Sequence, residues 1–232
     1  MAEVNPIKNA LKSLSVVTTN ILVALIFFVF TAKISSPEFF GKVAVIQLLE
    51  VVTSTIFYFI PGQIITREVS YLYARNELRK DMIERFFAIP FLALPFFFFL
   101  LTFPGYVKLA IPYLFLFLLN NVMTSIMQGM DMFTESTISG ITFSFVRWVI
   151  SIVAVLKQSI YLFVLIWLMG SVISVMMNYA FVAKRIGLFL PSFDIPFLLK
   201  HFRVSLPLYL SSITVFFSSQ GDRITTAYLL GS

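Results

Sequence analysis

Charged side chains inside long apolar stretches are the residues of this sequence that could do chemistry. Glu50 and Arg147 lie in two such stretches, and the neighbours Asp222 and Arg223 lie in a third. A charge at the centre of a bilayer costs at least about 2.5–3.5 kcal/mol, so such residues face a partner or a watery cavity. Two roles are open for Arg147. It pairs with Glu50, expected at a similar depth, or its planar guanidinium binds an anionic group such as phosphate.

Polar residues at helical spacing extend these charged positions into stripes. There are four such stripes, each on one face of its own predicted helix. They are Gln47, Glu50 and Ser54; Asn121, Thr124, Gln128 and Asp131; Thr137, Gly140, Ser144, Arg147 and Ser151; and Ser211, Thr214, Ser218, Asp222 and Thr225. Such faces avoid lipid, so they either join helices, at roughly 0.6 kcal/mol for each polar contact, or line a hydrated central cavity. The candidates for lining a substrate cavity are Arg147, Glu50, Asn121, Gln128, Ser144 and Asp222.

Other kinds of chemistry lack the residues that they require. The chain has no cysteine, and its one histidine, His201, lies between Lys200 and Arg203, where a solvated interfacial residue is expected. No cluster has metal-ligand spacing, and no phosphate-binding loop or nucleophile elbow occurs. We therefore expect no metal, no cofactor, no enzymatic activity and no ATP-driven pumping within this chain.

The composition excludes most soluble classes of protein. Hydrophobic residues make up 59% of the 232 and charged residues only 12%, whereas a soluble domain carries about 25% charged residues. The mean hydropathy of +0.94 points the same way. A soluble enzyme, a disordered tail and a nucleic-acid-binding domain are therefore not expected. The net charge of +6 is read as a signal of membrane orientation.

Seven apolar stretches are long enough to cross a membrane as helices. They cover residues 14–34, 43–65, 86–103, 107–128, 137–156, 159–182 and 204 to the chain end. The first exceeds the apolar core of a signal peptide and precedes no cleavage site, so it is expected to be an uncleaved span. The sequence predicts an all-α polytopic membrane protein. Residues 1–203 would form a six-helix lobe, and 204–232 the first helix of a second lobe.

Basic residues between the stretches predict the orientation. With the N-terminus inside, the inner segments hold Lys8, Lys12, Arg67, Arg75, Arg79, Lys80, Arg85, Lys184, Arg185, Lys200 and Arg203, and the outer loops hold Lys33, Lys42, Lys108 and Lys157. This bias predicts a cell-membrane protein with a cytoplasmic N-terminus. The inner segment 66–85 could be a solvated connector or an interfacial helix attracted to anionic lipid.

Three segments resemble a known family. They read SSPEFFGKVAVIQLL after the first stretch, PGQIITREVSYLYARNE at the end of the second, and LPLYLSSITVFFSSQGDRITTAYLLGS at the chain end. In order and spacing they are similar to the first turn, the basic inner loop and the seventh helix of polysaccharide flippases. These flippases belong to the multidrug/oligosaccharidyl-lipid/polysaccharide exporter superfamily.

The resemblance implies two six-helix lobes, a central cavity and alternating access. It further implies that the cargo is a lipid-linked oligosaccharide, moved from the inner to the outer leaflet for polysaccharide biosynthesis. The pyrophosphate of such a cargo would give Arg147 a ligand, and Asp222 is the second residue carried over. Because family members run to about twice this length, we expect a truncated chain, a fragment, or a half that needs a second lobe or a second copy.

Three other functions stay open at this point. An ion-coupled exporter of organic cations from the same superfamily would need an acidic excess in its cavity, and Glu50 and Asp222 are balanced by Arg147 and Arg223. A membrane transferase acting on polyprenyl lipids would need a large soluble loop or catalytic carboxylates, and the sequence shows neither. A non-transporting subunit of a polysaccharide-synthesis complex would need neither. In each case the expected partners are lipids or lipid-linked saccharides, and not nucleic acid.

Overall fold

A computed structural model describes residues 6–230, including the side chains of residues 14, 15 and 17–219. The described chain is mostly helical, with no strand in residues 6–230. The helices are α1 (Pro6–Ile34), α2 (Pro37–Ile56), α3 (Gly62–Ala74), α4 (Lys80–Phe87), α5 (Leu94–Leu100), α6 (Gly105–Gly129), α7 (Phe133–Ser144), α8 (Ile152–Leu156), α9 (Ile160–Ile186) and α10 (Ile195–Leu230), with a 3-10 helix η1 (Ile89–Ala93) and a π-helical segment η2 (Phe145–Ile150).

Six segments of the described chain are long and apolar enough to cross a membrane. They are Val17–Ile34, Pro37–Ile56, Lys80–Leu100, Gly105–Gly129, Phe133–Leu156 and Ile160–Ile186. The prediction of an all-α polytopic membrane protein is therefore confirmed. The seventh expected stretch lies in α10, a helix over Ile195–Leu230 that is not among these six.

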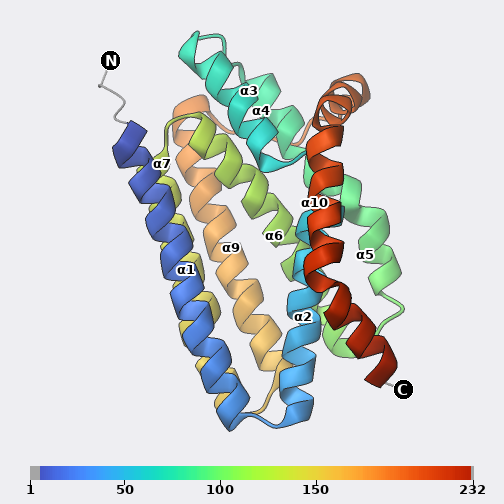
Figure 1. The fold of residues 1–232 in the computed structure, drawn as a ribbon. Coiled ribbons are helices and arrows are strands. Elements are labelled where there is room, and N and C mark those ends of the chain that lie inside the picture. The colour runs from blue at the N-terminus through green and yellow to red at the C-terminus, as the bar shows by residue number, and fades with distance from the viewer. Residues whose placement is uncertain (1–5, 231–232) are drawn as a thin grey trace.

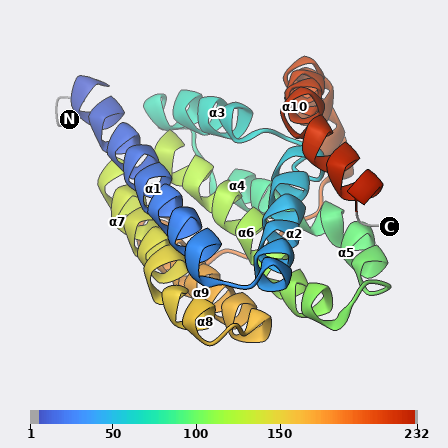
Figure 2. The same cartoon turned by 60° about the horizontal axis from the view of Figure 1, so that its bottom comes forward.

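The spans form a bundle in which α6 occupies the middle (Figures 1 and 2). It packs along α9 and under α3, while α1 lies at the outside against α7. In Figure 1 the N-terminal end, α3, α4 and the α9–α10 connection lie at the top, and the α1–α2 and α5–α6 turns lie at the bottom. The basic segments that the sequence assigned to one side of the membrane thus share one end of the bundle.

The second span differs from its prediction over residues 43–65. Helix α2 begins at Pro37 after Ser36, whose hydroxyl accepts a hydrogen bond from the Phe39 N–H, and it ends at Ile56. Proline lacks an N–H and disfavours helical geometry in the residue before it, so Pro61 starts a new helix, α3. Segment 66–85, for which the sequence allows a connector or an interfacial helix, consists mostly of α3 and α4.

The third span, predicted over residues 86–103, also differs. It runs over Lys80–Leu100 and is built from three short helices. Pro90 lies in the 3-10 helix η1 and Pro95 in the first turn of α5, which are positions where a missing N–H removes no helical hydrogen bond. The two prolines thus divide this span into short helices without costing it a helical hydrogen bond.

The fifth span contains a wide helical turn. Between α7 and α8 the residues Phe145–Ile150 are π-helical. Such bulges insert an extra residue into an α-helix and occur often at functional sites. Here the bulge directs both Arg147 and Trp148 into the protein, where each is buried.

Two apolar clusters hold the bundle together. One surrounds Trp167 and Tyr113 between α6, α9 and η2, and the other surrounds Phe86 and Ile126 where α3 and α4 cover the end of α6. Because lipid is as apolar as these side chains, their contribution inside the membrane comes from close packing and not from removal of water.

His201 contradicts the expectation of a solvated residue. The residue is 6% exposed, its ring packs against Phe86 and Phe197, and its Nδ1 lies 2.9 Å from the Phe197 carbonyl oxygen. The first turns of α10 place it inside the second cluster because they lie across the end of the bundle. Lys200 and Arg203, its charged neighbours in the sequence, point outward and are exposed.

Candidate functional site

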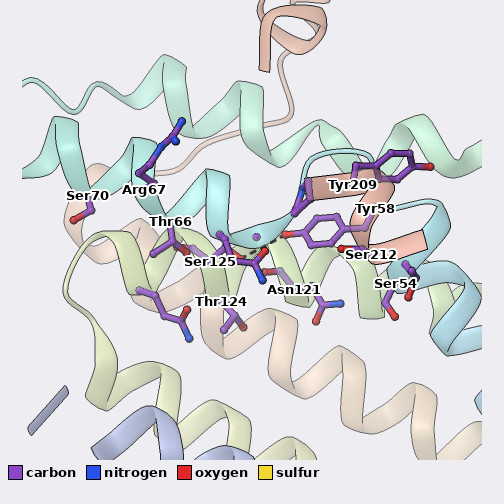
Figure 3. Close-up of a pocket in the computed structure, with 15 residues that line it drawn as sticks. Ser54, Tyr58, Thr66, Arg67, Ser70, Asn121, Thr124, Ser125, Tyr209 and Ser212 are labelled. Atoms are coloured by element: carbon purple, nitrogen blue, oxygen red, sulfur yellow. Dashed lines mark hydrogen bonds between the residues drawn. The ribbon is translucent and has the colours of Figure 1, made fainter. Parts of the chain in front are cut away.

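A polar cavity of about 710 Å³ lies between α2, α3, α6 and α10. Figure 3 shows its lining as hydroxyl and amide side chains from these helices, with Tyr209 and Ser212 contributed by α10. No acidic side chain is among the described residues that line it, and Arg67 is the one basic residue of that lining. In Figure 3 the Arg67 side chain extends from α3 away from α6, and it pairs with Glu68 at 2.9 Å.

The polar stripe of α6 forms one wall of this cavity. Asn121, Thr124 and Gln128 line it, as does Ser54 from the stripe of α2. Two of the six candidates, Asn121 and Gln128, are therefore brought together here. Asp131, the last residue of the same stripe, follows the end of α6 and is exposed.

Another wall is α3, whose part in the site the sequence did not predict. Its residues Gln63, Thr66, Arg67 and Ser70 line the cavity at steps of three, one and three, a polar face at helical spacing. This pattern becomes recognisable in the sequence when Pro61 is taken as the start of a new helix. The Thr66 hydroxyl donates to the Ser125 carbonyl at 3.1 Å, which fixes α3 on α6.

The connector from α2 to α3 contributes Tyr58 and Pro61 to the lining of the cavity. The Tyr58 hydroxyl lies 3.5 Å from the Ser125 hydroxyl, and burial raises the pKa of Tyr58 well above its usual value. The Tyr209 hydroxyl of α10 donates a hydrogen bond to the Ile56 carbonyl at 2.6 Å. It thus provides a partner for a carbonyl group at the end of α2, where the helix itself offers none.

Glu50 and Arg147 do not line this cavity. They form a buried ion pair between α2 and η2, with Arg147 Nη2 2.5 Å from Glu50 Oε2 and both residues less than 10% exposed. Tyr113 of α6 donates a hydrogen bond to the same carboxylate oxygen. This arrangement corresponds to the first of the two roles that the sequence left open for Arg147, a partner for Glu50.

Aromatic rings enclose the guanidinium of Arg147. Its central carbon lies 4.2 Å from the centre of the Trp167 ring and 4.3 Å from that of Trp148, with Phe143 and Phe117 farther out. A cation over aromatic faces is attracted by their negative π-electron density, most strongly when water is excluded. Arg147 is thus held by a carboxylate and by rings, and no described residue accepts a hydrogen bond from its Nε.

Ser144 does not line the cavity but joins two helices. Ser144 donates to Asn20 Oδ1 at 3.0 Å, and the Trp148 indole donates to the same oxygen at 2.8 Å, which ties α1 to the fifth span. The described part of the predicted α10 stripe does not line this cavity. Ser211, Thr214 and Ser218 are exposed. The side chain of Asp222 lies outside the described residues.

A second polar cluster is packed without a cavity. Asn120 Oδ1 accepts hydrogen bonds from Ser174 at 2.8 Å and from Asn178 at 2.7 Å, and Ser174 also contacts Ser139 at 2.9 Å. All four residues are buried. The network joins α6, α7 and α9 in the manner expected of polar residues between membrane helices.

Asn120→Leu is expected to lower the free energy of unfolding by about 1–3 kcal/mol. The Ser174 hydroxyl and the Asn178 amide would lose their common acceptor while staying buried. Thermal unfolding of the detergent-purified protein measures the change. The control is Asn121→Leu at the next position, since no described residue is hydrogen-bonded to the Asn121 side chain and its loss should cost less. Equal losses in both variants would contradict a structural role for the network.

No group of three or more histidine, aspartate or glutamate side chains in the described part of the chain is placed to hold a metal ion. The chain matches no family model, and no curated protein or solved structure is significantly similar to it.

Proposed function

We propose that the chain transports lipid-linked oligosaccharide or polysaccharide precursors across the cell membrane by alternating access. The polar cavity carries this proposal, since hydroxyl and amide side chains are suited to hydrogen-bond a saccharide. The apolar outer surface of the spans would leave the lipid part of the cargo in the bilayer. The resemblance of the three sequence segments to polysaccharide flippases supports the same cargo.

The charges of the lining favour this cargo over an organic cation. The described lining has no acidic side chain, and its one basic side chain, Arg67, is paired with Glu68, so it offers no counter-ion to a cationic cargo. The basic end of the bundle would face the cytoplasm by the positive-inside rule. Cargo would then enter the cavity from the inner leaflet beside α3, with a second lobe or a second copy completing the far wall.

Thiol labelling tests whether this cavity is filled with water. The chain has no cysteine, so a single Thr124→Cys substitution provides one reporter in the lining. In native membranes a membrane-impermeant maleimide is expected to label it. Ser174→Cys, buried in the packed network, is the control and should react at least about tenfold more slowly, because it reacts only when the bundle opens. Equal rates would show that the cavity is no wetter than the core.

Protection of the same thiol tests the cargo. A polyprenyl-pyrophosphate oligosaccharide is expected to slow labelling of Thr124→Cys, whereas the same lipid without its saccharide should have a smaller effect. A hydrophobic phosphonium cation is the comparison for a cation exporter. Protection by the phosphonium alone would overturn the proposed cargo while leaving the cavity established.

A further inference from the structure

The first turns of α10 present an unpaired basic face at the end of the bundle. Lys200 and Arg203 lie in an open hollow with Ile195, Leu199 and Val204, all on one side of the helix. We call these five residues the basic face. In Figure 1 these turns are seen nearly end-on at the top, so this part of α10 runs across the bundle axis, as a helix lying at a membrane surface does.

The basic face differs in charge from its surroundings. Most described basic residues of this end have an acidic partner: Arg67 with Glu68, Arg79 and Arg85 with Asp81, Lys80 with Glu84, and Arg185 with Glu135. Lys200 and Arg203 form no ion pair with any residue in the described part of the chain, and no acidic residue lines their hollow. Two neighbouring cations without a counter-ion fit an anionic ligand.

The apolar members of the basic face fit a ligand that has an apolar portion. Ile195 is 66% exposed, and the preceding connection adds Leu188 and Leu190 at 74% and 75%. Large apolar side chains this exposed beside a membrane-spanning bundle are expected to enter the boundary between head groups and acyl chains. Free phosphate would contact only the two cations and would leave these apolar side chains exposed.

The opposite side of the same turns is firmly anchored. Asp194 accepts a hydrogen bond from the Phe197 N–H at 3.0 Å and pairs with Arg85 at 3.3 Å. Phe197 and His201 are buried against Phe86. The direction in which Lys200 and Arg203 point is therefore fixed by packing on α4, and little order has to be gained on binding.

We propose that the basic face binds an anionic phospholipid of the membrane leaflet at this end of the bundle. Lys200 and Arg203 would hold its phosphate, and Ile195 and Leu199 would lie beside its acyl chains. The site is separate from the polar cavity and does not depend on the identity of the cargo.

Native mass spectrometry of the detergent-purified full chain tests the site. With equal amounts of phosphatidylglycerol and phosphatidylcholine, the protein is expected to retain the anionic lipid preferentially, by about 30-fold, because each basic residue near an anionic head group contributes about fivefold. The double substitution Lys200→Gln/Arg203→Gln should bring the preference close to one. Both side chains are exposed, so thermal unfolding should be unchanged.

Arg79→Gln/Lys80→Gln is the matched control. It removes the same charge from the same end, but at residues that already have acidic partners, and it should keep most of the preference. An equal loss in both variants would assign the effect to net charge and overturn the site. The absence of any lipid preference in the unmodified chain would overturn it too. So would a dimer that only Lys200→Gln/Arg203→Gln dissociates, because a second copy would then cover this face.

Discussion

Arg147→Met is expected to lower the free energy of unfolding by about 3–5 kcal/mol, the largest effect of a single substitution that we predict. The Glu50 carboxylate would stay buried with the Tyr113 hydroxyl as its remaining partner. Glu50→Leu should have an effect of similar size, because it leaves the guanidinium among Trp148 and Trp167 without an anion. For a chain of this length the loss corresponds to about 6–20 °C in the unfolding temperature.

The double variant Glu50→Leu/Arg147→Met separates the two roles of Arg147. If the ion pair is structural, the double variant should be more stable than either single variant, since no buried charge is left alone. Thermal unfolding of the four proteins in one detergent gives the coupling energy. Any transport activity should recover along with the stability. A double variant that folds well but does not transport would show that this ion pair has a role in transport beyond stability.

Gly129→Ala is expected to cost at least about 1–3 kcal/mol and to displace α3 from α6. A Cβ at this position would lie 2.6 Å from Val69 Cβ and 2.9 Å from the Thr66 carbonyl oxygen. Neither atom is the end of a flexible side chain, so the helix itself has to move. Because α3 forms a wall of the polar cavity, labelling of Thr124→Cys should change in the same variant.

Gly41→Ala is the control for that substitution. Gly41 also lies within a helix, α2, but a Cβ added to it would have no heavy atom of another part of the chain within 4 Å. Alanine there should be neutral or stabilising by about 0.5–1 kcal/mol, because it favours the helix more than glycine does. If both substitutions have the same effect, close contact between α3 and α6 is not what Gly129 provides.

Length and hydropathy were sufficient to predict the class of fold, because a membrane-spanning helix needs about 20 apolar residues whatever its neighbours are. The limits of the helices were harder. Hydropathy does not distinguish a helix from an apolar connector, so the stretch 43–65 concealed the break between α2 and α3. Pro61 marks the break, but a proline within an apolar stretch is equally consistent with a kink in one continuous helix.

The candidate site was predictable only in part for a related reason. The stripe of Asn121 and Gln128 could be read because α6 is one regular helix. The α3 wall depended on recognising a helix that crosses the bundle. Arg147 was correctly seen to need a partner or a cavity, yet helical periodicity could not choose between them. That choice depended on how α2, α6 and η2 pack together.

The π-helical turn at Phe145–Ile150 has a consequence for sequence alignment. An ordinary helix advances by about 100° per residue, so one inserted residue rotates everything that follows it by that angle unless a wide turn absorbs it. Deleting one residue here would therefore either unwind the bulge with Ala154 and Val155 kept inside, or turn these two buried residues toward lipid. A relative lacking the bulge would be one residue shorter between Ser144 and Ser151. A gap-free comparison would then place Arg147 against the wrong position.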